Sequence, residues 1–175
     1  MNFRLPPASR LTPITWTLSA SIPGKAIYAG TSIGLMRSID NGTTWKVISS
    51  FGFPNRAAIA RIAFSPSNSD DLFLCSTSGL YESKNGGIHW RRIADSNVGA
   101  DISALEFLDN KGTKMIAADK AEGILSYSQD GGQNWVKIPL NENQSPAYSM
   151  MVDPLQPNAI YIGTKDYGIY RVKIP

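Results

Sequence analysis

Three eight-residue segments of the chain share one pattern and are evenly spaced. They are SIDNGTTW (38–45), SKNGGIHW (83–90) and SQDGGQNW (128–135), so that each Trp follows the preceding one by 45 residues. A period of about 20 to 50 residues is typical of proteins whose repeated units bury their faces against neighbouring units. The chain is therefore expected to fold as a series of similar units.

The segments around each turn alternate apolar and polar residues. The three full copies are AIYAGTSIGLMRSIDNGTTWKVI, LFLCSTSGLYESKNGGIHWRRI and MIAADKAEGILSYSQDGGQNWVKI, and a fourth, AIYIGTKDYGIYRVKIP, ends before its turn. A further alternating run precedes each copy: ITWTLSA, IARIAFS, ISALEFL and YSMMVDP. This pattern predicts four short antiparallel strands per unit, with the repeated turn joining the third strand to the fourth. Such a unit is typical of a β-propeller blade.

The repeats predict an all-β fold, a small β-propeller of about four four-stranded antiparallel blades, as one domain over residues 1–175. The repeats cover about 7–50, 51–95, 96–140, and 141–175 plus 1–6. The last repeat lacks its fourth strand, and residues 1–6 match that strand's position when shifted by one period. We therefore expect the N-terminal strand to pair with IYRVKI and close the last blade. Two alternatives stay open, an eight-bladed ring of two chains and a fragment of a longer propeller.

Composition and charge argue against several kinds of partner. The chain is 42% hydrophobic and 18% charged, with 15 Gly and 11 Pro, as in turn-rich globular domains. Its 17 Lys and Arg are scattered among 14 Asp and Glu, so no nucleic-acid surface is expected. Neither a leader nor a membrane-spanning apolar run is evident, which predicts no membrane insertion and a cytoplasmic location. Cys75, within LFLC, is expected to be a buried, unreactive thiol.

The three octets resemble the Asp box, also called the BNR repeat, whose pattern is Ser-x-Asp-x-Gly-x-Thr-Trp. The chain is thus similar to the Asp-box propellers of sialidases, sortilin-type ectodomains and xyloglucan hydrolases, many of which are secreted or periplasmic. In those families the turn lies on the rim, away from the ligand. The resemblance therefore implies that the octets are architectural.

The residue types of the octets suit a tight turn. Ser and Asp oxygens accept backbone N–H bonds, Gly permits a positive φ, and Trp covers the turn. The middle octet has Asn85 in place of the acid, which keeps the acceptor oxygen and loses the charge. The chain lacks EF-hand spacing and a His/Cys cluster, so we expect neither a metal nor a cofactor. The predicted structural residues are Ser38, Asp40, Gly42 and Trp45; Ser83, Asn85, Gly87 and Trp90; and Ser128, Asp130, Gly132 and Trp135.

In the resembling propellers, ligands bind near the axis, where the second strand turns into the third and where one blade leads to the next. Phe51 and Phe53, on one such loop, are the apolar residues best suited to anchor a partner. Asp119 is expected to be an exposed acid whose replacement by Ala costs under about 0.5 kcal/mol. The predicted contact residues are Phe51, Phe53, Arg56, Lys120, Glu122, Lys165, Asp166 and Tyr167.

Only one weak catalytic candidate emerges. The segment FRLP (3–6) resembles the Phe/Tyr-Arg-Ile-Pro box of sialidases, which implies that Arg4 binds a substrate carboxylate. Sialidases have six blades, however, and no Tyr-Glu pair can be assigned here. We therefore predict a non-catalytic binding or scaffold module that recognises a protein, peptide or glycan through its loops. The alternative is a sialidase-like glycoside hydrolase or a fragment of one, and a homodimer is a further alternative.

Overall fold

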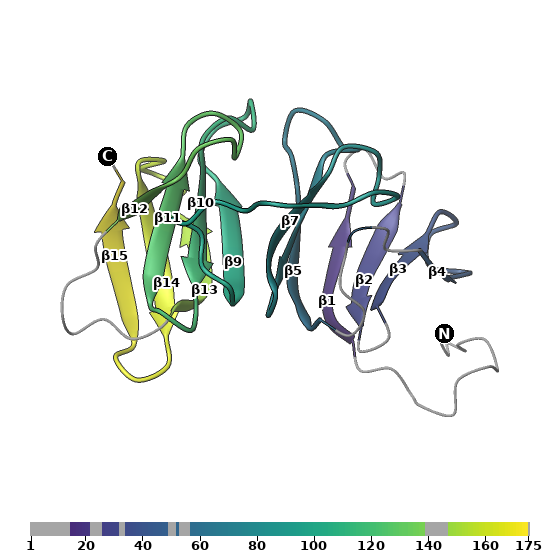
Figure 1. Cartoon of the computed structure of the whole chain (residues 1–175), viewed down its shortest axis with the longest axis horizontal. Coiled ribbons are helices and arrows are strands. Elements are labelled where there is room, and N and C mark those ends of the chain that lie inside the picture. The colour runs from purple at the N-terminus through teal and green to yellow at the C-terminus, as the bar shows by residue number, and fades with distance from the viewer. Residues whose placement is uncertain are drawn as a thin grey trace.

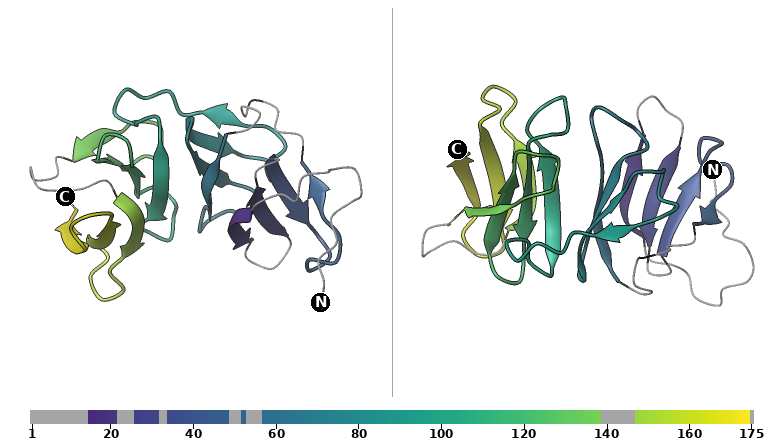
Figure 2. Two further views of the ribbon diagram at one scale, coloured as in Figure 1. Left: turned by 90° about the horizontal axis from the view of Figure 1, so that it is seen from below. Right: turned by 45° about the horizontal axis from the view of Figure 1, so that its top comes forward.

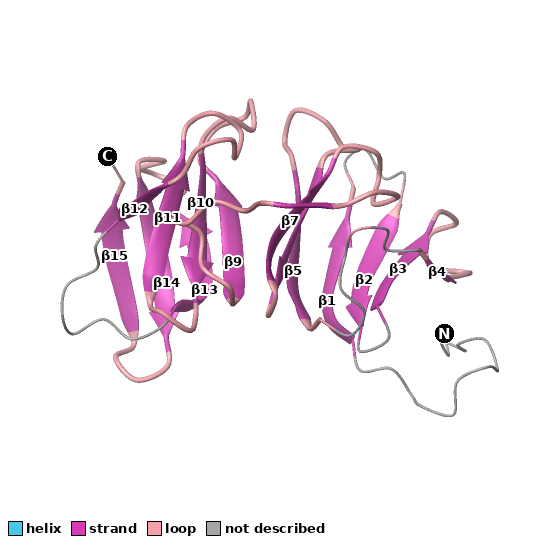
Figure 3. Ribbon diagram, viewed as in Figure 1, coloured by secondary structure: helices cyan, strands magenta, loops and turns pink. Residues whose placement is uncertain are grey.

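The computed structural model describes residues 15–21, 26–31, 34–48, 52, 57–138 and 147–174, which form strands and their connections (Figure 3). The strands make four antiparallel sheets, here called blades 1 to 4, in which each strand pairs with the next one in the chain. The strands are β1 (Thr15–Ala20), β2 (Ile27–Thr31), β3 (Gly34–Ser38) and β4 (Lys46–Val47) in blade 1; β5 (Ile59–Phe64), β6 (Leu72–Ser76), β7 (Gly79–Ser83) and β8 (Arg91–Arg92) in blade 2; β9 (Ile102–Phe107), β10 (Met115–Asp119), β11 (Ile124–Ser128) and β12 (Val136–Ile138) in blade 3; and β13 (Ala147–Val152), β14 (Ala159–Thr164) and β15 (Ile169–Lys173) in blade 4.

The four blades stand side by side in chain order (Figure 1). The first strands of neighbouring blades contact one another, β1 with β5, β5 with β9 and β9 with β13. Seen from below, the blades follow an arc with blades 1 and 4 at its two ends (Figure 2). The expected all-β, propeller-type architecture of antiparallel blades is thus confirmed. The expected pairing of residues 1–6 with β15 lies outside the described residues.

The apolar core lies between the blades. One cluster joins Tyr28 and Leu35 of blade 1 to blade 2, a second joins Phe73 and Leu80 of blade 2 to blade 3, and a third joins Leu125 of blade 3 to blade 4. Because a middle blade is covered on both faces, β6, β7 and β10 are buried at every position. β15, in the last blade, instead alternates between exposed and half-buried residues. Continuous apolar runs such as LFLC therefore mark strands packed on both sides.

Cys75 belongs to the cluster between blades 2 and 3. Its side chain is fully buried, and burial raises the pKa of its thiol to about 12. The thiol is therefore protonated at neutral pH and acts as a small apolar group. In the described part of the chain, no helix has the length and apolar character needed to span a membrane.

Candidate functional site

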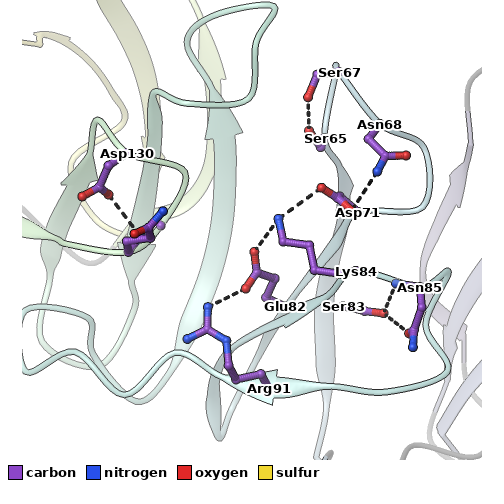
Figure 4. Close-up of polar contacts among 12 residues, drawn as sticks. Ser65, Ser67, Asn68, Asp71, Glu82, Ser83, Lys84, Asn85, Arg91 and Asp130 are labelled. Carbon is purple, nitrogen blue, oxygen red and sulfur yellow. Dashed lines mark hydrogen bonds and ion pairs between the residues drawn. The ribbon is translucent and has the colours of Figure 1, made fainter.

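The three Asp-box turns have the same hydrogen bonds. In the first, Ser38 Oγ accepts the Gly42 N–H at 2.8 Å and donates to Asp40 Oδ1 at 2.8 Å, while Asp40 Oδ1 accepts the Thr44 N–H at 2.8 Å. The middle turn keeps this arrangement with an amide, because Asn85 Oδ1 accepts from Ser83 Oγ at 3.0 Å and from the His89 N–H at 2.9 Å (Figure 4). The carboxylates are thus occupied within their own turns.

The third turn shows how the carboxylate is held. Asp130 Oδ1 accepts the Asn134 N–H at 2.9 Å, and Ser128 Oγ accepts the Gly132 N–H at 2.9 Å. These bonds favour the charged form of the acid, chiefly through the Asn134 N–H, and lower the pKa of Asp130 to about 2. In the first turn, the Thr44 hydroxyl is the main cause that lowers the pKa of Asp40 to about 2.

Each turn tryptophan donates from its indole nitrogen to the glycine carbonyl three residues earlier. The N···O distances are 3.1 Å for Trp45, 3.0 Å for Trp90 and 3.1 Å for Trp135. Trp90 and Trp135 then pack into the clusters shared with the preceding blade. Trp45, in the first blade, is only half-buried. Where a blade precedes it, a turn tryptophan therefore fills part of the apolar interface between the two blades.

The connections between consecutive strands lie alternately at the two ends of each blade. The arc therefore has two faces, each formed by one set of connections. The Asp-box turns lie beside the connections between the first and second strands, as the bonds from the Gly86 N–H to Asp70 O and from the Gly131 N–H to Thr113 O show, both at 2.9 Å. We call this side the turn face. The opposite side, where the second strand turns into the third and one blade leads to the next, is the loop face.

A shallow hollow of about 210 Å³ opens on the loop face between blades 2 and 3. Its apolar floor comes from the start of β5, and its polar rim comes from the loops of both blades. Backbone hydrogen bonds hold the loops of this hollow in place. The Thr77 N–H donates to Ala58 O at 3.2 Å, and the Lys120 N–H donates to Asp101 O at 2.8 Å. The lining residues are Ala58, Ile59, Ala60, Thr77, Asp101, Ser103 and Lys120.

Lys120 is the cation at the rim of this hollow. Its ammonium group lies 3.6 Å from Asp101 Oδ2 and 5.5 Å from the centre of the Tyr148 ring, which comes from blade 4. Ser103 Oγ reaches across the same joint and donates to Ala147 O at 2.5 Å. Residues of blades 3 and 4 therefore meet at this point, beside the blade 2 residues that line the hollow. The site offers an ammonium donor, a carboxylate acceptor, a half-exposed aromatic ring and an apolar floor.

The expected role of Asp119 as an exposed acid is wrong. Its side chain is 1% exposed, and its carboxylate accepts the Asp101 N–H at 3.2 Å and the Glu122 N–H at 2.7 Å. A Cβ at Gly99 would collide with this carboxylate. Asp119 therefore holds the loop that enters blade 3 against the loop that carries Lys120.

The other predicted contact residues are spread over the chain. Glu122 is exposed, with its carboxylate 3.9 Å from Lys137 Nζ. Lys165, Asp166 and Tyr167 are exposed on the connection between β14 and β15 and do not line the hollow. The sequence did not indicate Tyr148, Thr77 or Ser103 as site residues. Tyr148 lies in an alternating strand pattern, and Thr77 and Ser103 are small polar residues of an ordinary kind. The expected residues Arg4, Phe51, Phe53 and Arg56 lie outside the described residues.

A larger opening, of about 430 Å³, lies on the outer rim between β8 and the turn of blade 3. The charged residues of its lining are engaged within the protein, and Arg92 Nε donates to Ser78 O at 3.2 Å. Arg91 is 2.5 Å from Glu82, which also binds Lys84 at 2.8 Å (Figure 4). Asp95 accepts the Trp135 N–H at 3.0 Å. We therefore take the loop-face hollow as the candidate site. Among the described residues, no group of three or more His, Cys, Asp or Glu side chains is arranged to hold a metal ion.

The repeated turns and their blades define a BNR-type β-propeller repeat protein. A family model described as photosynthesis system II assembly factor YCF48 matches residues 48–174, well over half of the chain. The chain therefore belongs to this family. No curated protein matches it.

Solved structures share the fold. An ancestral GH74 enzyme has a TM-score of 0.73 at 23% identity, with 90% of this chain and 22% of that chain covered. The GH74 xyloglucanase from Xanthomonas campestris has a TM-score of 0.71 at 18% identity, with coverages of 90% and 28%. A structure described as YCF48 bound to D1 peptide has a TM-score of 0.52 at 16% identity, with coverages of 99% and 67%. The chain thus spans about a quarter of the GH74 proteins, and at these identities the likeness concerns the fold alone.

Proposed function

We propose that this chain is a peptide-binding propeller module that engages an extended segment of a protein at the loop-face hollow beside Lys120. The observation that carries the proposal is the placement of Lys120 at the rim, beside Asp101 and 5.5 Å from the Tyr148 ring. Membership of the YCF48 family supports it, because the YCF48 structure with the same fold is described as bound to D1 peptide.

The chemistry of the hollow suits an extended peptide. Backbone carbonyls or an acidic side chain of the peptide would accept hydrogen bonds from Lys120, and a peptide N–H would donate to Asp101. The apolar floor at Ile59 and the ring of Tyr148 would receive an apolar side chain. Because Lys120 and Asp101 already face each other, binding exchanges one set of polar contacts for another, which favours selectivity over high affinity.

The test is a binding assay with an array of extended peptides that includes the D1 peptide and its scrambled version. We expect Lys120→Glu and Tyr148→Ala to weaken the selected peptides by about tenfold or more, since a charged hydrogen bond from Lys120 and the burial of an apolar side chain against the Tyr148 ring each contribute on this order. Lys111→Glu, an exposed lysine in the β9–β10 connection of the turn face, has the same charge change and should leave binding unaltered.

Two results would overturn the proposal. One is peptide binding that Lys120→Glu and Lys111→Glu weaken equally, which would indicate a charge effect without a site. The other is binding of xyloglucan oligosaccharides by a chain that binds no peptide of the array, which would favour a carbohydrate module. Circular dichroism of each variant establishes that the blades remain folded.

A further inference from the structure

The first strands of blades 2, 3 and 4 share an irregularity at their second residue. In β5, the residues on either side of Ala60 pair with adjacent residues of β6, so that Ala60 itself has no partner in the register. Ser103 in β9 and Tyr148 in β13 are left out of the register in the same way. A bulge of this kind re-aims a side chain and is frequent beside binding sites. Each of these blades therefore presents one bulge residue at the end of its first strand that adjoins the loop face.

The three bulge residues differ in size, and this difference shapes the loop face. Ala60 and Ser103 are small, and both line the hollow between blades 2 and 3. Tyr148 is large, and the centre of its ring lies 5.5 Å from Lys120 Nζ at the joint between blades 3 and 4. The hollow is open because the bulge residue of blade 2 carries only a methyl group.

The hollow has an apolar side and a charged side. Blade 2 contributes Ala58, Ile59 and Ala60, and blade 3 contributes Asp101 and Lys120. A volume of about 210 Å³ is roughly 7 Å across, which matches the distance of about 6.6 Å between side chains i and i+2 on one face of an extended chain. Two alternate side chains of an extended peptide therefore reach the two sides of the hollow at once.

The charged side is neutral as a whole. Lys120 Nζ and Asp101 Oδ2 lie 3.6 Å apart, and the two side chains are 35% and 25% exposed, so a ligand can reach both. An acidic ligand group would be attracted by Lys120 and repelled by Asp101, and a basic group would meet the reverse. A carboxamide instead carries an acceptor oxygen and a donor NH₂ on one planar group. It can accept from the ammonium and donate to the carboxylate without adding a charge.

We propose that the hollow selects a peptide segment in which a carboxamide side chain, Asn or Gln, stands two residues from an aliphatic side chain such as Leu, Ile or Val. The carboxamide bridges Lys120 and Asp101, and the aliphatic side chain fills the space beside Ala60. This selectivity rests on the peptide-binding function proposed above and specifies the sequence that the site recognises. Asp101 determines specificity through its charge, and Ala60 determines it through its size.

The first test compares peptides that differ at one position. Short extended peptides carry Gln, Glu, Lys or Met at this position, with Leu two residues before or after it, and fluorescence anisotropy measures their dissociation constants. We expect Gln to bind about tenfold more tightly than Glu or Lys, since repulsion between like charges and the loss of a charged hydrogen bond each act on this order. Met has a similar length without the amide and should also bind more weakly than Gln. Equal binding of Gln with Glu or with Met would overturn the proposal.

A substitution in the protein should change the preference. Asp101→Asn removes the repulsion, so this variant should bind the Glu peptide at least as tightly as the Gln peptide. Asp70→Asn, at an exposed acid of the turn face, makes the same charge change and should retain the preference of the wild type. An unchanged preference in Asp101→Asn, or a changed one in Asp70→Asn, would contradict the bridging role of the carboxamide.

The aliphatic position is tested by filling the hollow from the protein side. In the wild type, replacing Leu of the peptide by Ala should weaken binding by about tenfold, because less apolar surface is buried. Ala60→Leu should remove this difference between the two peptides and leave Gln preferred over Glu. A Leu preference that survives Ala60→Leu, in a variant whose circular dichroism matches the wild type, would place the aliphatic side chain elsewhere and overturn this half of the proposal.

These outcomes are distinct from a failure of peptide binding itself. If no peptide binds, or if Lys120→Glu and Lys111→Glu weaken all peptides equally, the proposed function fails. If peptides bind in a manner that depends on Lys120 but show no preference for Gln, the function stands and the carboxamide selectivity is wrong.

Discussion

At the residue scale, the turn tryptophans differ in burial although their turns have the same hydrogen bonds. Trp90 is 6% exposed because blade 1 covers it, whereas Trp45 is half-buried. We predict that Trp90→Ala lowers the free energy of unfolding by about 3–5 kcal/mol, the usual cost for a buried aromatic, and that Trp45→Ala costs about half of that or less. Urea unfolding of the two variants measures the difference, and equal losses would contradict the role of the preceding blade.

Asp119 gives a second prediction at this scale. Its replacement by Ala leaves the N–H groups of Asp101 and Glu122 without their acceptor, and hydrogen bonds to a charged group contribute about 1.5–3 kcal/mol each. Asp119→Ala should therefore lower the free energy of unfolding by at least about 2 kcal/mol. Asp119→Asn retains one acceptor oxygen and should lose less. An alanine variant as stable as the wild type would show that water replaces the carboxylate.

The turn carboxylates predict a loss of stability in acid. The pKa of Asp40 and of Asp130 is about 2 in the folded chain, below the ordinary value of 3.8. A lowered folded pKa stabilises the fold above the unfolded pKa, and this contribution disappears as the pH falls from about 4 toward 2. The variant with both Asp40→Asn and Asp130→Asn imitates Asn85 and should lose less stability between pH 5 and pH 2.5 in urea titrations. Parallel losses in variant and wild type would assign the acid effect to other groups.

At the element scale, the loops that enter successive blades pass close to the turn tryptophans. Asn97 Nδ2 donates to Trp135 O at 2.8 Å, and Ser126 Oγ donates to Asn97 O. Gly52, one repeat earlier, occupies the equivalent place, and a Cβ there would lie 2.2 Å from Trp90 O. The loop therefore approaches the turn too closely for a side chain at Gly52.

Gly34 provides a matched control for Gly52. Both have positive φ, +119° at Gly34 and +90° at Gly52, but a Cβ at Gly34 would meet nothing within 4 Å. We predict that Gly34→Ala costs about 1–2 kcal/mol from backbone strain alone, and that Gly52→Ala costs about 1–3 kcal/mol more because of the added clash. Thermal and urea unfolding provide the comparison. Similar costs would mean that the loop moves aside.

The sequence predicts the elements better than it predicts the site. The tryptophan period and the alternating runs are local signals, and they place the blades and the turns. The burial of Asp119 is not a local signal, because it depends on the loop that comes from the preceding blade and donates the Asp101 N–H to its carboxylate. Tyr148 was missed for the same reason, since its neighbour Lys120 belongs to another blade. Lys120 could be found because a cation in a connection between strands is visible in the sequence.

At the scale of the whole molecule, stability is shared among three joints, because each blade contacts only its neighbours. A chain of such units opens most readily at its ends. We predict that amides of β6 and β10, whose strands are buried throughout, exchange with deuterium most slowly, and that amides of β15 exchange fastest. Mass spectrometry of peptides from the labelled chain measures this order. Uniform protection over all four blades would instead indicate a single cooperative unit.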